Sequence, residues 1–264
     1  MSRRDNRLER RGRLLPPTAP ASIPLPSPAV RPVSRSRLLD FRSLLLVAPV
    51  LLLSVVAHEY AHGYAALRQG DTTAYQLGRL TWNPAKHIDP VMTVLVPVML
   101  ALAGGPIFGG AKPVPVDPRN YRHYKRGDII VSLAGVTTNV LLAGVFAALV
   151  IPLGVAGQQV GGAAETFAIL QRMALYGIQI NLFLALFNLL PLPPLDGSHV
   201  FKYLLPPALA LQYQALGRFG FALLFLLLVF GKGVLRWWLT PAFVGTNFLV
   251  GLVRPFVLLG AGGA

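Results

Sequence analysis

Several apolar stretches of this chain exceed the roughly 18 residues that a membrane-spanning helix requires. Three of them run from about 43 to 67, from about 128 to 153 and from about 167 to 190. Hydrophobic residues make up 54% of the 264 residues and charged residues only 13%, whereas water-soluble domains carry about 25% charged residues. The chain is therefore predicted to be an all-α membrane protein that crosses the bilayer several times.

These stretches divide the chain into three parts. Residues 1–42 contain ten arginines and many prolines, and we expect a disordered arm there, with a transit peptide as the alternative. Residues 43–232 are predicted to form the membrane core, which includes a fourth, shorter span at about 219–230. Residues 233–264 are apolar but carry tryptophans, which suit the membrane interface.

The formal net charge of +14 raises the question of nucleic-acid binding. No groove-reading motif accompanies the charge, and basic residues also hold the loops of membrane proteins on the cytoplasmic side. The lipid bilayer, not nucleic acid, is therefore the expected partner. The chain has no cysteine, so any metal must be bound by histidine and carboxylate side chains.

A His-Glu-x-x-His motif lies in the first apolar stretch, at His58, Glu59 and His62. Its spacing places both histidines on one face of a helix, one turn apart, where they can bind one zinc ion. Glu59 lies next to that face and can act as a general base on a zinc-bound water. In a soluble protein such residues are often solvated, but an apolar span offers little water. The motif therefore predicts one zinc site within the membrane.

A catalytic zinc ion needs a third protein ligand and an open position for water. Asp196 is best placed, because it follows an apolar span that the prolines from Pro191 to Pro194 end. The alternative is that Asp196-Gly197 is only a turn at the end of that span. The other candidates for the third ligand are His87, Asp89, His123, Glu165 and His199.

Together, the two distant motifs resemble the site-2 protease family of intramembrane zinc metalloproteases. The resemblance covers about residues 44–230 and is strongest for the short bacterial branch without appended soluble domains. The segment Ala134–Asn139 is similar to the family's Ala-Gly-Pro plus Asn motif, although Val136 replaces the proline. The resemblance implies zinc bound by His58, His62 and Asp196, and Glu59 as the catalytic acid and base.

The family resemblance also implies a substrate, a peptide bond in or near a transmembrane segment of a membrane protein. Asn188 belongs to the family pattern and could hold the substrate backbone or cap freed carbonyls. Prolines alternate with Val114 and Val116, which predicts an extended edge segment that an unwound substrate could pair with. Asn139 and Asn181 are expected to hydrogen-bond between helices. The alternative function is a membrane ion or metal transporter that uses the same side chains as a relay.

For the two motifs to meet at one depth near a membrane face, the spans that carry them should run in the same direction. One crossing should then lie between them, yet two apolar runs do, 91–108 and 128–153. We therefore expect 91–108 to be a re-entrant or membrane-embedded hairpin; the alternative is an ordinary span, with the site deep enough for antiparallel helices to meet. Ten basic residues lie on the motif side of the membrane, against four near the first span plus Arg172 on the other. This bias predicts an active site that opens toward the cytoplasm of a bacterial cell.

Overall fold

The computed structural model describes residues 41–95, 99 and 110–258. Within these ranges the chain forms helices, turns and extended loops, and no β-strand. The prediction of an all-α membrane protein is thereby confirmed. The predicted arm at 1–42 lies almost wholly outside the described residues, as does most of the expected hairpin at 91–108.

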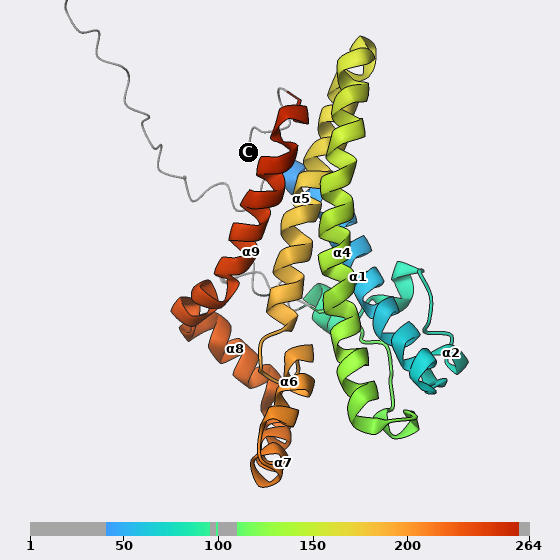
Figure 1. Ribbon diagram of the computed structural model, residues 1–264, viewed down its shortest axis with the longest axis vertical. Helices are drawn as coiled ribbons and strands as arrows, with labels where there is room; N and C mark the ends of the chain where they lie inside the picture. Colours follow the sequence, from blue (N-terminus) through green and yellow to red (C-terminus); the bar gives the residue numbers. More distant parts are fainter. Residues whose placement is uncertain (1–40, 96–98, 100–109, 259–264) are drawn as a thin grey trace, which may run out of the picture. The chain divides into compact units, whose positions relative to one another are not determined.

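Four long helices form the framework (Figure 1). They are α1 (Phe41–Gln69), α4 (Tyr124–Gln159), α5 (Ala164–Asn188) and α9 (Lys232–Val253). Four stretches are long and apolar enough to cross a membrane: Leu45–Gln69, Tyr124–Gln159, Gly161–Asn188 and Pro207–Phe230. The shorter helices are α2 (Thr73–Gln76), α6 (Asp196–Phe201), α7 (Pro207–Ala215) and α8 (Gly220–Phe230), and 3-10 turns cover Pro84–His87, Pro118–Asn120, Gly161–Ala163, Lys202–Leu204, Leu216–Phe219 and Arg254–Phe256. Residues Pro90–Leu95 form a short π-helix.

Helices α1 and α5 run in the same direction, and α4 packs against both in the opposite direction (Figure 1). The order of the contacts records this arrangement, because residue numbers fall along α1 as they rise along α4. Hydrogen bonds join His62 to Val131, His58 to Asn139, Asn139 to Asn181, and Gln171 to Val150. The C-terminal ends of α1 and α5 therefore lie on the same side, as the convergence of the two motifs requires.

The apolar core lies where α1, α4, α5 and α9 meet. Its buried members include Val50 of α1, Phe146 of α4, Ile178 of α5 and Val253 of α9. Small residues allow transmembrane helices to approach closely. Gly177 has this role in α5, because a Cβ atom there would lie only 2.4 Å from the ring of Phe146.

The segment between α5 and α6 turns sharply. Helix α5 ends at Asn188, and the following prolines cannot continue its hydrogen-bond pattern. The chain then begins α6 at Asp196. Gly197 packs directly on the end of α5, since a Cβ atom there would lie 2.1 Å from the carbonyl oxygen of Leu189. Only glycine fits this contact, which brings Asp196 back beside the other helices.

A buried carboxylate, Asp71, organises the loop that follows α1. It accepts hydrogen bonds from the backbone and hydroxyl of Thr73, from the backbone N–H of Asp117 and from the side chain of Asn120. Burial alone raises the pKa of a carboxyl group, but these donors outweigh it and hold the pKa of Asp71 below its ordinary value. Asp71 thereby ties the extended segment 111–117 to the end of α1.

Candidate metal centre

His58, His62 and Asp196 converge on one point between α1, α4 and α6. The Nε2 atoms of the two histidines lie 2.9 Å apart, and Oδ2 of Asp196 lies 3.2 Å from one and 3.3 Å from the other. Ligand atoms about 2.0–2.1 Å from a tetrahedral zinc ion lie about 3.3 Å from one another. The spacing of the three atoms therefore fits zinc.

The two imidazole rings present their lone pairs to each other. Nδ1 of His58 lies 2.6 Å from Oδ1 of Asn139, and Nδ1 of His62 lies 2.7 Å from the carbonyl oxygen of Val131. Both partners are acceptors, so each Nδ1 carries the proton and each Nε2 carries a lone pair. The buried Oδ2 of Asp196 has no hydrogen-bond partner among the described residues and adds a third acceptor. Three acceptors at these distances repel one another unless a cation lies between them.

A buried network fixes Asn139, and through it the ring of His58. The Nδ2 atom of Asn139 donates to Oδ1 of Asn181 at 2.8 Å and to the carbonyl oxygen of Ser54 at 3.4 Å. Asn181 in turn donates to Oγ of Ser54 at 2.8 Å. All three side chains are fully buried. Because Nδ2 is engaged, Asn139 turns its oxygen toward His58, which is the kind of outer contact that orients metal-binding histidines.

Ser54 is the member of this network that the sequence analysis missed. A single serine in an apolar run is a weak signal, since it usually bonds to its own helix. Ser54 does this too, because its hydroxyl donates to the carbonyl oxygen of Val50 at 2.8 Å. Its role as acceptor for Asn181 depends on how α1 and α5 are rotated against each other, which hydropathy does not reveal.

Glu59 is half-buried on the same turn of α1, beside an extended stretch of chain. Its Oε2 atom accepts a hydrogen bond of 2.8 Å from the backbone N–H of Val114. The side chain of Val114 is buried against Gly63, where a Cβ atom would lie 2.9 Å from it. Arg79 donates to the carbonyl groups of the two residues before Val114, at 3.1 and 3.2 Å. The segment 111–117 therefore lies extended along α1 at the motif.

The two other residues predicted to contact a substrate, Val116 and Asn188, each contact other parts of this chain in the structure. Val116 packs partly buried against the cluster that contains Ala66 and Tyr121. Asn188 is half-buried, and its Nδ2 atom donates to the carbonyl oxygen of Leu184 within α5 at 2.9 Å. Their roles toward a substrate stay predictions.

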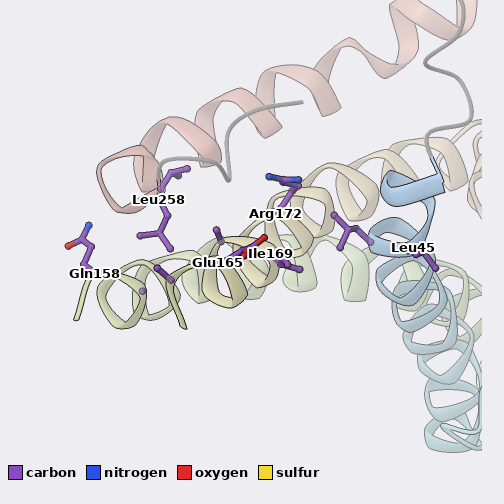
Figure 2. Close-up of a pocket in the computed structure, with 11 residues that line it drawn as sticks. Leu45, Gln158, Glu165, Ile169, Arg172 and Leu258 are labelled. Carbon is purple, nitrogen blue, oxygen red and sulfur yellow. The ribbon is translucent and has the colours of Figure 1, made fainter. Parts of the chain in front are cut away.

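The other candidates for the third ligand have different surroundings. His199 lies 3.3 Å from a carboxylate oxygen of Asp128, and Nε2 of His87 lies 3.0 Å from the carbonyl oxygen of Thr81. Glu165 and Arg172 line a pocket of about 860 Å³ between the start of α1, the end of α4 and the start of α5 (Figure 2). That pocket lies at the opposite ends of these helices from the histidines. In the part of the chain that the structure describes, Asp196 is the carboxylate that completes the group.

A His-Glu-x-x-His helix joined by a distant carboxylate, among helices that can span a membrane, defines a membrane zinc metallopeptidase. The comparison with known families agrees, since the profile of peptidase family M50 matches residues 46–227. The chain belongs to this family, the site-2 protease family. The resemblance stated from the sequence is thereby confirmed.

The names of similar proteins point the same way. YwhC, named as a candidate zinc metalloprotease of Bacillus subtilis, is 38% identical over 71% of this chain and 82% of its own length. Rip2 of Mycolicibacterium smegmatis, named likewise, is 30% identical over 70% of this chain and 67% of its own length. MJ0611 of Methanocaldococcus jannaschii is 40% identical over a shorter stretch, 28% of this chain and 32% of its own length. No solved structure matches the chain.

Family membership confirms three predictions made from the sequence. The protein is an enzyme, a metalloendopeptidase, and not a transporter that uses the same side chains as a relay. Its cofactor is zinc. It is an integral membrane protein, which the four apolar stretches also indicate.

Proposed function

We propose that this protein is an intramembrane endopeptidase that cleaves transmembrane segments of other membrane proteins, with His58, His62 and Asp196 as zinc ligands. The depth of the metal centre carries the proposal. Residue 57 is the midpoint of the apolar stretch Leu45–Gln69, so His58 lies one residue beyond it. His62 lies five residues beyond the midpoint, about 8 Å along the helix, and so is well inside a hydrocarbon core of about 30 Å.

The chemistry follows from the chain's own residues. A zinc ion held by His58, His62 and Asp196 would act as a Lewis acid, which would make water nucleophilic at neutral pH and polarise a carbonyl group. Glu59 accepts the proton of the attacking water and then transfers it to the nitrogen of the leaving amine. The hydrogen bond from Val114 occupies Oε2 of Glu59 and fixes the direction of the carboxylate. The network behind Asn139 keeps the imidazole of His58 from turning.

The extended segment 111–117 is the proposed docking edge for the substrate. Helical substrates hide their backbone groups, so the scissile bond must be unwound before attack. Strand addition to an exposed edge is a common way to hold such a backbone. Pro113 and Pro115 have no N–H groups, and Arg79 already donates to the carbonyl oxygen of Pro113. This part of the edge is therefore proposed to offer the carbonyl oxygen of Pro115 to an N–H group of a bound strand. Asn188 is proposed to contact the same substrate backbone.

The proposed membrane orientation places the metal centre toward the cytoplasm. The loops at the C-terminal end of α1 and the N-terminal end of α4 carry most of the basic residues of the core. Basic loops tend to stay on the cytoplasmic side of membranes. Substrates would then be cut near the cytoplasmic half of their spans.

Proteoliposomes that contain the purified protein and tagged single-span peptides test the function directly. We expect cuts within the apolar segment of the peptides, mapped by mass spectrometry. Glu59→Gln should retain one zinc ion per chain and cleave nothing, because only the proton acceptor is lost. Glu165→Gln, the same change in the pocket of Figure 2, is the control and should cleave normally. Cuts confined to water-exposed tails, or cleavage by Glu59→Gln, would refute the proposal.

A further inference from the structure

A second buried cluster lies one helical turn beyond the metal centre, around Asp128 of α4. The carboxylate of Asp128 is 2% exposed and accepts from three side chains. Lys202 Nζ lies 2.6 Å from it, the hydroxyl of Tyr203 2.8 Å and Nδ1 of His199 3.3 Å. All three belong to one short stretch of chain, the end of α6 and the 3-10 turn that continues it.

The stretch that carries these donors begins with Asp196. Helical residues three or four apart share one face, so Asp196, His199 and the pair Lys202 and Tyr203 form a single stripe along it. One end of the stripe meets the two histidines of the metal centre. Its other end meets Asp128. The contact with Asp128 therefore restrains both the rotation of α6 about its axis and its position along α4.

The partner helix α4 has a matching stripe. Asp128, Val131, Gly135 and Asn139 follow at spacings of three or four residues. Val131 accepts from His62 and Asn139 accepts from His58. Gly135 leaves room for both rings, since a Cβ atom there would lie 2.5 Å from the imidazole of each histidine. Two of the three metal-binding side chains are thus oriented directly by α4, and Asp128 is the carboxylate of α4 that accepts from the stretch carrying the third.

The buried ammonium group of Lys202 and the buried carboxylate of Asp128 stabilise each other. Lys202 is 8% exposed, and its ammonium group lies 5.0 Å from the ring centre of Tyr203 and 5.9 Å from that of Tyr124. Burial raises the pKa of the Tyr203 phenol and the nearby Asp128 carboxylate raises it further, so the hydroxyl stays protonated as a donor. A buried ion pair is often no more stabilising than apolar residues of similar size, so stability alone does not explain the pair of Lys202 and Asp128. The orientation of α6 gives the pair a role.

We propose that Asp128 is a positioning residue for the third zinc ligand, and that its contacts with Lys202, Tyr203 and His199 hold the Asp196 carboxylate against the two histidines. The inference rests on the proposed role of Asp196 as a ligand. Outer contacts of this kind change metal affinity by about 10- to 100-fold when they are removed. A similar loss of zinc affinity is expected here, without loss of the fold.

Zinc affinity, measured by competition with a chromophoric chelator on the purified full chain, tests this inference. Asp128→Asn should weaken zinc binding about 10- to 100-fold. The double variant Asp128→Leu with Lys202→Met leaves no unpaired charge and should show the same loss while folded. Tyr203→Phe removes a single donor and should weaken binding about fivefold. Glu165→Gln, in the pocket of Figure 2 at the opposite ends of the helices, is the control and should bind zinc normally.

The absorption spectrum of the cobalt-substituted protein supplies a readout that a purely structural role would not move. The Asp128 variants should shift the cobalt bands, because the carboxylate ligand is displaced. A folded double variant with unchanged zinc affinity and an unchanged cobalt spectrum would overturn the inference. If the double variant does not fold, unchanged affinity and spectrum in Tyr203→Phe overturn it instead. Asp196→Asn separates the two proposals, since full zinc affinity in that variant would remove the ligand assignment itself.

Discussion

The smallest change that should disable the enzyme is one methyl group at Gly135. Its Cβ would lie 2.5 Å from Cε1 of His58 and from Nε2 of His62, far inside van der Waals contact. Gly135→Ala should therefore push the rings apart and lower zinc affinity at least tenfold, which chelator competition would measure. Gly144→Ala, on the same helix, meets no atom within 4 Å and should bind zinc normally. Equal affinity in the two variants would contradict this account of the site.

Asn139 is expected to matter through the tautomer of His58. Asn139→Ala removes the acceptor of Nδ1, so the proton is free to move to Nε2 and block the lone pair. We expect zinc affinity to fall about 10- to 100-fold, measured by the same competition. Asn188→Ala is a matched control, because that side chain bonds within its own helix. If Asn188→Ala raises the KM for a membrane peptide but leaves zinc affinity unchanged, its proposed substrate role gains support.

Among single residues, the sequence predicts the candidate metal ligands better than the residues that surround them. The sequence predicts His58, His62 and Asp196 as a group because charged or metal-binding side chains are costly in or beside apolar spans. Ser54 and Asp128 carry weaker signals, since a serine can bond to its own helix and Asp128 stands at the polar start of a span. Their roles depend on which faces of the helices meet. That choice is made by long-range packing, which one sequence does not display.

Among the elements, the loop after α1 depends on one carboxylate, Asp71. Asp71→Asn should weaken its hydrogen bonds to Thr73, Asp117 and Asn120 and cost about 1.5–3 kcal/mol of stability at neutral pH. Folding lowers the pKa of Asp71, so its contribution to stability is present above pH 3.8, the ordinary pKa of this carboxyl group. That contribution is lost as the pH falls through the lowered pKa. The thermal midpoints of the unsubstituted protein and of Asp71→Asn should therefore differ most at neutral pH and converge in acid. A difference that persists unchanged in acid would show that the charge of Asp71 is not what stabilises the loop.

The element boundaries show what hydropathy can and cannot supply. The apolar run at 128–153 lies within α4, but the helix extends from Tyr124 to Gln159 because polar residues and glycine continue the same backbone pattern beyond the apolar run. Residues 233–264 were expected to be interfacial, and most of them form the helix α9. Trp238 on this helix donates to the carbonyl oxygen of Leu186 at 2.7 Å, an attachment to α5 that hydropathy alone does not predict.

For the whole molecule, the proposed orientation can be tested through the absence of cysteine. Single cysteines in a chain without any native cysteine give an unambiguous labelling pattern. Lys86→Cys lies on the side of the metal centre and Gln158→Cys at the opposite end of α4, and both positions are exposed. A membrane-impermeant maleimide added to intact bacterial cells should label Gln158→Cys at once, and Lys86→Cys only after permeabilisation. The reverse pattern would place the active site outside the cell.

The shared direction of α1 and α5 is predictable by counting crossings, because two motifs near the ends of their spans meet at one membrane face when the spans are parallel. Their separation along the chain, more than a hundred residues from His62 to Asp196, gave no other clue to proximity. The rotation of α4, which presents Gly135 and Asn139 to the histidines, was not predictable. The faces of α4 differ little in hydrophobicity, because nearly every residue of such a span is apolar, so the sequence does not reveal which face meets α1.

The three acceptor atoms of the candidate metal centre couple zinc binding to folding. They are Nε2 of His58, Nε2 of His62 and Oδ2 of Asp196. Their lone pairs lie within 2.9–3.3 Å of one another only in the folded chain, so a zinc ion binds the folded state and not the unfolded one. Thermodynamic linkage then makes the ion a stabilising ligand, worth about 2.7 kcal/mol when free zinc exceeds its Kd a hundredfold. Calorimetry across a zinc titration should show the unfolding temperature rise with the logarithm of zinc concentration, and Asp196→Asn should flatten that rise.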